Sequence, residues 1–170
     1  MLDAIGTIVR LGLAAVWLVS GAVKLSDPGQ TYVAVQAYDV LPVGMVDVVA
    51  TALPLVELVL GLCLLLGLVT RIAAAASAAL VLVLIAAIAQ AWARGLSIDC
   101  GCFGGGGQVA AGQTSYPLEI LRDAGFLVLA CWLLVRPRSL LSVDGWLRAG
   151  SQRPGALGDD GDVEERRDAE

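Results

Sequence analysis

Residues 46–92 read VDVVATALPLVELVLGLCLLLGLVTRIAAAASAALVLVLIAAIAQAW and decide the fold of the chain. They hold two apolar runs, residues 46–68 and 72–92. Each run is long enough to cross the hydrocarbon core of a bilayer, about 30 Å thick, as a helix of roughly 20 residues. Lipid cannot satisfy backbone polar groups, so each run must form its hydrogen bonds within itself. The short link at 69–71 makes the two runs an antiparallel pair of transmembrane helices.

Two further spans flank this pair, at residues 5–23 and 117–135. The last one is uniformly apolar only toward its C-terminal end, but a start at Pro117 gives it full length. Proline suits the first turn of a helix, and Glu119 favours the positive end of the helix dipole. Pro137 then ends the span.

The first span has an alternative interpretation as a secretory signal peptide. Residues 11–22 have the apolar core and the small residues of a cleavage site. The preceding segment carries Asp3 and only a late Arg10, whereas a signal peptide begins with a basic segment. A retained transmembrane helix is therefore the favoured interpretation.

The composition also indicates a membrane protein. The 170-residue chain is 58% hydrophobic and 16% charged, whereas soluble domains carry about 25% charged residues. We therefore predict an all-α integral membrane protein, with a four-helix transmembrane bundle over residues 1–138. Residues 139–170 are expected to form a short segment at the inner membrane interface and then a disordered acidic tail.

Several kinds of site are excluded by residue types that the chain lacks. It has no histidine, which excludes Ser-His-Asp and Cys-His catalysis and most zinc sites, and we expect no metal. The sequence has no basic cluster with interleaved aromatic residues, so nucleic acid is not an expected partner. Chemistry must therefore come from cysteine, carboxylates, basic side chains or a bound cofactor.

The basic residues near the span ends predict the orientation in the membrane. They are Arg10, Arg71, Arg136, Arg138 and Arg148 at the end that holds both termini, and Lys24, Arg94 and Arg122 at the other end. The positive-inside rule places the richer end in the cytoplasm. We therefore expect a multi-pass plasma-membrane protein with both termini cytoplasmic and the 94–116 loop outside, on the oxidising side where disulfides persist.

That outer loop contains SIDCGCFGGGGQ, residues 97–108, with Cys100 and Cys102 one residue apart. A disulfide between them closes a very small ring and requires local backbone distortion, which Gly101 helps to absorb. Strained disulfides are labile and suited to exchange. The four glycines at 104–107 are expected to leave the pair mobile, and we predict a reactive dithiol or disulfide. Incidental free thiols, metal binding or disulfides formed elsewhere are the alternatives, since Cys-x-x-Cys is the commoner redox spacing.

The other two cysteines, Cys63 and Cys131, lie inside predicted helices. Buried cysteine usually packs as a small hydrophobe, so both are expected in the core. A relay of electrons through them from the outer pair is the alternative.

Glu57 lies near the middle of the second span, one turn after Pro54. An ionisable group at that depth is costly and indicates a functional position. Its expected partners are Lys24, at the outer end of the first span, and Arg122, in the first turns of the last. A structural ion pair or a protonated carboxyl that holds the bundle together is the equally open alternative.

Five segments together carry a family likeness. They are RLGLAAVWLVSGAVKLSDP (10–28), AYDVLP (37–42), LPLVELVLG (53–61), DCGCFG (99–104) and EILRD (119–123). In these segments the chain resembles the MauE/DoxX group of small four-helix membrane proteins associated with redox chemistry, and MauE more than the broader DoxX proteins. The resemblance extends from about Arg10 to Val135.

The resemblance implies a helper for disulfide formation or electron transfer outside the cytoplasm. MauE is linked to methylamine utilisation, where it is thought to assist maturation of the disulfide-rich small subunit of methylamine dehydrogenase with a thioredoxin-like partner. DoxX relatives are associated with quinone-linked sulfur oxidation. On this chain the family's redox pair falls on Cys100 and Cys102, and Lys24, Glu57 and Arg122 are the polar bundle positions.

These observations predict a membrane thiol–disulfide oxidoreductase that acts on an extracytoplasmic thioredoxin-fold partner. Electrons are expected to leave to a quinone held between the helices, with Glu57, Arg122 or Lys24 near its head group. The alternative is a non-catalytic anchor or scaffold subunit of an oxidoreductase complex, and a small-solute transporter is third. The sequence leaves the oligomeric state open.

Overall fold

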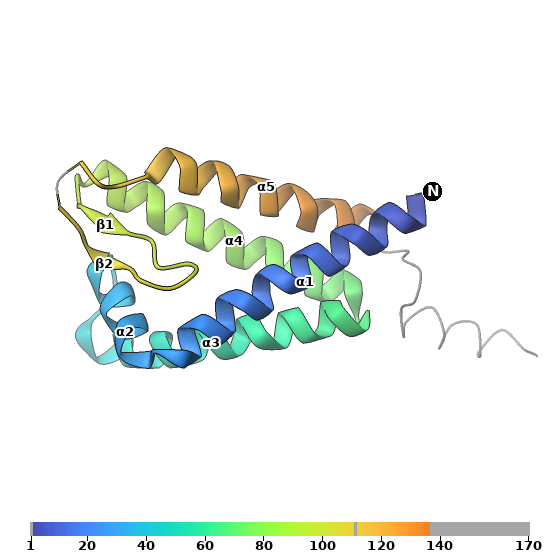
Figure 1. The fold of residues 1–170 in the computed structure, drawn as a ribbon, viewed down its shortest axis with the longest axis horizontal. Helices are drawn as coiled ribbons and strands as arrows, with labels where there is room; N and C mark the ends of the chain where they lie inside the picture. The colour runs from blue at the N-terminus through green and yellow to red at the C-terminus, as the bar shows by residue number, and fades with distance from the viewer. Residues whose placement is uncertain (1, 111, 137–170) are drawn as a thin grey trace, which may run out of the picture.

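A computed structural model describes residues 2–110 and 112–136 of the chain. Within them the chain forms five helices and one two-stranded hairpin (Figure 1). The elements are α1 (Leu2–Ser26), α2 (Pro28–Ala37), α3 (Val43–Leu66), α4 (Thr70–Ala93), β1 (Ile98–Asp99), β2 (Gly107–Gln108) and α5 (Tyr116–Val135). The four predicted spans correspond to α1, α3, α4 and α5. The predicted interfacial segment and tail, 139–170, lie outside the described residues.

Three of these helices, α1, α3 and α4, are long and apolar enough to cross a membrane. The fourth predicted span, α5, has 20 residues but carries Glu119, Arg122 and Asp123 in its first turns. The structure therefore confirms a mostly helical membrane protein with three helices of transmembrane character. That α5 is a fourth span remains a prediction.

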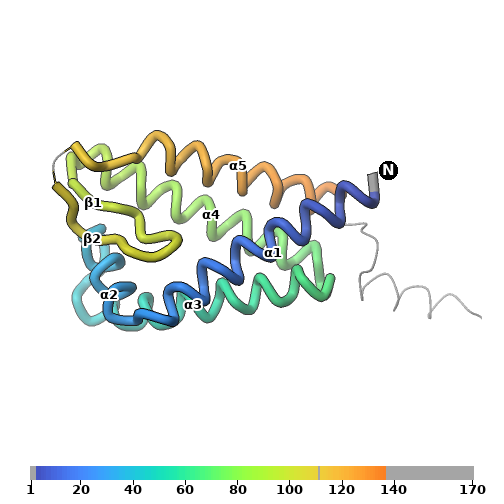
Figure 2. The backbone as a smooth tube through the Cα atoms, viewed as in Figure 1, coloured from blue at the N-terminus to red at the C-terminus, as the bar shows by residue number. Residues whose placement is uncertain are grey.

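The long helices form two closely packed pairs, α1 with α3 and α4 with α5, whereas α3 and α4 contact each other less. Figure 2 shows the start of α1, the α3–α4 turn and the end of α5 at one end of the bundle. α2 and the hairpin lie at the other end. The chain thus returns to its starting end after α5, as the predicted topology requires.

Glycines bring α1 and α3 into close contact. A Cβ atom at Gly61 would lie 2.7 Å from Leu18 Cγ, and one at Gly21 would lie 2.9 Å from the Pro54 carbonyl oxygen. Small residues of this kind allow helix backbones to approach within a membrane. The core continues into the second pair, where the indole of Trp17 donates a 2.9 Å hydrogen bond to Ser77 Oγ on α4.

The short helix α2 was not expected from the sequence. Its residues lack a clear apolar period and include Gly29 and several β-branched side chains, all weak helix formers. The start signal was nevertheless present, because Asp27 caps the helix by accepting from the Gln30 N–H and Pro28 occupies its first turn. α2 packs on α3 and β2.

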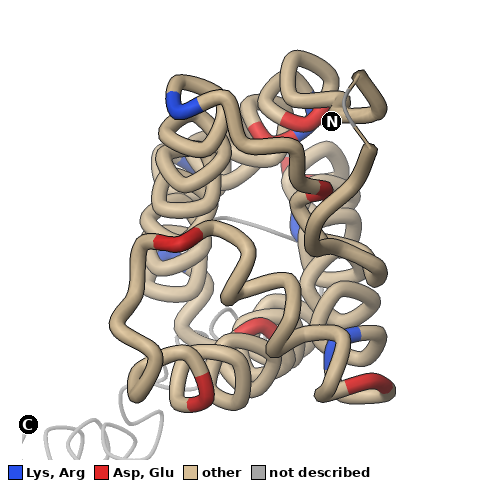
Figure 3. Tube along the Cα trace, turned by 90° about the vertical axis from the view of Figure 1, so that its left-hand side faces the viewer, with Lys and Arg blue, Asp and Glu red and all other residues tan. Residues whose placement is uncertain are grey.

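The hairpin is a small departure from the all-α prediction. β1 and β2 pair antiparallel, with Ile98 opposite Gln108 and Asp99 opposite Gly107. Together with α2 the hairpin covers one end of the bundle, where both acidic and basic positions occur along the chain (Figure 3). The two cysteines lie in the connection between the strands.

The glycines of this connection are packed, which corrects the expectation that they serve mobility. A Cβ at Gly104 would lie 2.6 Å from Val23 Cγ1, and one at Gly106 would lie 2.7 Å from Ala34 Cβ and 2.8 Å from Gly101 Cα. Both glycines also have positive φ angles, which residues with a side chain rarely adopt. The glycine run therefore fits the cysteine segment closely against α1 and α2.

Replacement of Gly106 by alanine tests this packing. Gly106→Ala should lower the free energy of unfolding by about 1–3 kcal/mol more than Gly112→Ala, because only the first adds an overpacked contact. Gly112 is a matched control, since its φ is also positive and a Cβ there would meet nothing within 4 Å. Denaturant unfolding of the two purified variants in detergent gives the comparison, and equal losses would contradict the packing argument.

Candidate functional site

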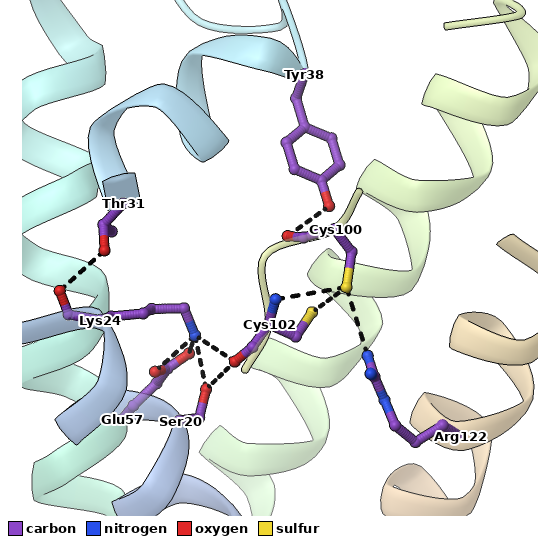
Figure 4. A network of polar contacts seen from close by, with 8 residues as sticks. All are labelled: Ser20, Lys24, Thr31, Tyr38, Glu57, Cys100, Cys102 and Arg122. Atoms are coloured by element: carbon purple, nitrogen blue, oxygen red, sulfur yellow. Dashed lines mark hydrogen bonds and ion pairs between the residues drawn. The ribbon is translucent and has the colours of Figure 1, made fainter. Parts of the chain in front are cut away.

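A buried ion pair lies where the cysteine segment meets the bundle. Lys24 Nζ on α1 lies 2.7 and 2.9 Å from the two carboxylate oxygens of Glu57 on α3. The Glu57 side chain is fully buried and that of Lys24 is 8% exposed. The same Nζ donates to Ser20 Oγ at 2.6 Å and to the Cys102 carbonyl oxygen at 3.1 Å (Figure 4). Such a set of hydrogen bonds offsets the cost of burying both charges.

Side chains from α1 and α2 hold the cysteine segment by its backbone carbonyls. The Ser20 hydroxyl donates to the Cys102 carbonyl at 2.7 Å, alongside Lys24. The Gln30 amide donates to the Gly106 carbonyl at 2.6 Å, and the Tyr38 hydroxyl donates to the Cys100 carbonyl at 3.1 Å. The segment is therefore fixed at several points, and these contacts define the position of its two sulfurs relative to α1 and α2.

The two sulfurs face one another. Cys100 Sγ and Cys102 Sγ are 3.0 Å apart, and both cysteines are free thiols. The Cys102 N–H donates to Cys100 Sγ at 3.4 Å, and Arg122 Nη2 on α5 donates to the same sulfur at 3.6 Å. Cys100 is half-buried, whereas Cys102 is only 8% exposed. The two sulfurs thus lie in contact, with Cys100 as the more accessible one.

These contacts separate the acidities of the two thiols. The hydrogen bond from the Cys102 thiol lowers the pKa of Cys100 to about 7, with further help from the Cys102 N–H and Arg122 and against the effect of burial. The pKa of Cys102 is raised, because its proton is held in that bond and because it is buried. Of the two sulfurs, Cys100 is therefore the one favoured as a thiolate.

Arg122 is oriented toward the sulfurs by two other contacts. Its Nε donates to Asp123 Oδ1 at 3.0 Å, and its guanidinium lies 5.1 Å from the centre of the Phe103 ring. Of the two partners expected for Glu57, Lys24 is confirmed. Arg122 was wrong as a partner of Glu57, because α5 places it on the other side of the cysteine segment, beside Cys100.

Two carboxylates near Cys100 were not predicted from the sequence as site residues. Asp99, Cys100 and Glu119 offer ligand atoms within 4.8 Å of one another. Glu119 is buried, and its Oε2 has no hydrogen-bond partner among the described residues. Such a set resembles a small metal site, but the guanidinium of Arg122 donates to the same sulfur and competes with a cation there. A carboxylate that takes up a thiol proton fits these neighbours better. The signal for Glu119 is its helical spacing to Arg122 and Asp123, whereas its place in the first turn indicated only a favourable interaction with the helix dipole.

The remaining cysteines lie outside this site. Cys63 on α3 is half-buried and packs against the core, as expected. Cys131 on α5 is exposed, so the expectation that it packs in the core was wrong. The hydrophobic pattern of α5 could not distinguish its exposed side from its core-facing side.

A comparison with protein families matches residues 2–136 to the family described as methylamine utilisation protein MauE. The match covers all four predicted spans and the Cys100–Gly101–Cys102 segment. Searches of curated proteins and of solved structures found no match.

Alkylation of the thiols as a function of pH tests the assignment of Cys100 as the thiolate. In a variant without Cys63 and Cys131, Cys100 should react with iodoacetamide with a midpoint near pH 7, where Cys102 stays unreactive. Arg122→Gln should move the midpoint upward, because the thiolate loses a cationic donor. Arg94→Gln is the control, since Arg94 pairs with Asp39 at the surface. Peptide mass spectrometry reads out each cysteine, and an unchanged midpoint in Arg122→Gln would contradict the role of that residue.

A double-mutant cycle tests the buried ion pair. Lys24→Met leaves the Glu57 carboxylate buried without its partner and should cost about 3–5 kcal/mol of unfolding free energy. The double variant Lys24→Met/Glu57→Met removes both charges and should recover most of that loss. Additive losses, measured by denaturant titration in detergent, would show that the pair does not act as a unit.

Proposed function

The chain belongs to the MauE family, and on that premise we propose that it is a membrane thiol–disulfide oxidoreductase that exchanges electrons with an extracytoplasmic thioredoxin-fold protein. One observation carries the proposal. Cys100 Sγ lies 3.0 Å from Cys102 Sγ and 3.6 Å from Arg122 Nη2, so a half-buried thiolate has its resolving thiol in reach. A cysteine pair that only braced a loop would not need a cationic donor at one sulfur.

The exchange proceeds through Cys100 in the oxidised protein. A thiolate of the partner attacks Cys100 Sγ, which forms a mixed disulfide and breaks the bond to Cys102. The partner's second thiol then attacks its own sulfur in the mixed disulfide, and Cys100 leaves. Two electrons and two protons pass from the partner to the pair. The low pKa of Cys100 makes it a good leaving group in the second step.

The same geometry supports α5 as the fourth span. Its charged residues turn inward, since Glu119 and Asp123 are 9% and 3% exposed. Leu118, Leu121 and Val128 form an apolar outer side. With four spans, the end that carries Arg71 and Arg136 faces the cytoplasm under the positive-inside rule. The cysteine segment then lies at the outer face of the plasma membrane, within reach of a secreted or tethered partner.

The family description supports a role in methylamine utilisation. We propose that the partner passes the disulfide on to a secreted oxidoreductase, which for the family's namesake process is methylamine dehydrogenase. A redox titration separates this function from that of a non-catalytic anchor. Exchange requires a reversible Cys100–Cys102 couple between about −120 and −270 mV, the range of known exchange proteins.

Trapping of the mixed disulfide in cells tests the exchange. In Cys102→Ser the Cys100 thiolate can attack the disulfide of an oxidised partner, and no second sulfur of this chain can resolve the product. The variant should therefore accumulate a covalent adduct between Cys100 and a thioredoxin-fold protein, visible on non-reducing gels and identified by mass spectrometry. Cys100→Ser should give no adduct. Cys131→Ser is the control for an exposed thiol outside the site and should behave as the wild type. Equal adduct in the two single variants of the pair, or none in either, would refute the proposed exchange.

A further inference from the structure

An apolar cavity adjoins the cysteine pair on the side away from Arg122. It has a volume of about 310 Å³ and lies between α2, α3, α4 and the Cys100–Gly101–Cys102 segment. Leu53 of α3 and Leu84 and Ala87 of α4 line it, so it lies in the halves of those spans nearest the hairpin. This size is at the lower end of the range of small-molecule sites, about 300–1,000 Å³.

We infer that this cavity binds the ring of a lipid-soluble quinone, which takes the electrons of the Cys100–Cys102 dithiol. The inference rests on the proposed function, because a pair that oxidises a partner becomes reduced and must be oxidised again. The oxidant has to accept two electrons and reach a site within the membrane. A quinone meets both conditions.

The walls of the cavity fit such a ligand. Apart from the cysteine segment, they are aliphatic except for three polar side chains: Lys24, Thr31 and Tyr38. At the rim, Val40 is 51% and Val83 63% exposed. The rim lies between α3 and α4. These two helices contact each other less than α1 contacts α3 or α4 contacts α5. An isoprenoid chain can leave between these helices into lipid while the ring stays against the cysteines.

The Tyr38 hydroxyl provides the polar contact that a quinone carbonyl needs. It lies at the cysteine end of the cavity and donates to the Cys100 carbonyl at 3.1 Å. Burial and the nearby thiols raise the pKa of Tyr38, so the group remains a protonated donor. Lys24 also lines the cavity, but its Nζ already serves Glu57, Ser20 and the Cys102 carbonyl.

The cavity favours a different quinone position from the one expected from the sequence. The hollow on the α5 side of Cys102, lined by Phe103 and Asp123, has a volume of only about 20 Å³, roughly the space of one water. Neither Glu57 nor Arg122 is among the residues that line the larger cavity. Of the three residues expected near a quinone head group, only Lys24 lies there.

The proposed step balances in atoms and electrons. The Cys100 and Cys102 thiols lose two electrons and two protons as the S–S bond forms. The quinone gains both electrons and both protons and becomes the hydroquinone. One turnover therefore forms one disulfide and one hydroquinone and returns the pair to the state that oxidises the partner.

The test uses the full chain with Cys63 and Cys131 replaced by alanine, reduced and placed in lipid nanodiscs. Decylubiquinone and, in a second arm, menaquinone-1 are added, and hydroquinone and remaining thiols are measured together. At least one of the two quinones should give one hydroquinone per disulfide. Ala87→Phe fills the cavity and should slow this reaction by about tenfold or more. Ala86→Phe is the matched control, because Ala86 is exposed on the same helix and should leave the rate within about twofold.

Two further measurements keep the outcomes distinct. Formation of the partner adduct by Cys102→Ser should be the same with and without Ala87→Phe. An unchanged adduct also shows that the Ala87→Phe variant folds. If Ala87→Phe does not fold, Leu84→Phe is used in its place. An azidoquinone should photolabel peptides from 34–53 and 80–87 of the wild-type chain. Failure of both quinones to oxidise the dithiol, a normal rate in the filled cavity, or label confined to α5 would overturn the quinone site while the partner adduct persists. Loss of the adduct itself would instead refute the proposed exchange.

Discussion

The arrangement of the site depends on one buried contact, the pair of Lys24 and Glu57. Neither charge is tolerable alone at that depth, so the two side chains fix α1 against α3. Lys24 then has further hydrogen-bonding capacity, which it uses on Ser20 and on the carbonyl of Cys102. The ion pair therefore holds the helices and also sets how deeply the cysteine segment enters the bundle.

Close backbone packing provides the second constraint on that segment. Gly104 and Gly106 lie against Val23 and Ala34 at distances that leave no room for a side chain. The position of the two thiols is therefore set mainly by the backbone of the segment, which is held at its glycines and its carbonyls. Cys100 keeps partial access to solvent while Cys102 is covered, and this difference in burial assigns the two sulfurs different roles.

Much of this organisation could be predicted from sequence, and the failures have physical causes. The length of the apolar runs predicted α1, α3 and α4, because lipid imposes a minimum span. α2 and the hairpin were not predicted, because ten helical residues and four strand residues carry little periodic signal. In the site, Lys24, Glu57, Arg122 and both cysteines were identified by residue type. Their pairing was partly wrong, since only the fold shows that Arg122 and Glu57 lie on opposite sides of the cysteine segment.

This two-sided arrangement would meet two separate requirements of the proposed thiol couple. A thiolate needs polar donors, which lower its pKa, whereas a lipid-soluble oxidant needs an apolar space. Arg122 and the carboxylates of α5 gather on one side of Cys100, where the hollow beside them has room for little more than water. The aliphatic cavity opens on the other side, where Tyr38 supplies a neutral donor. The sulfurs lie between the polar side and the aliphatic cavity. Each of these two environments can therefore be formed without weakening the other.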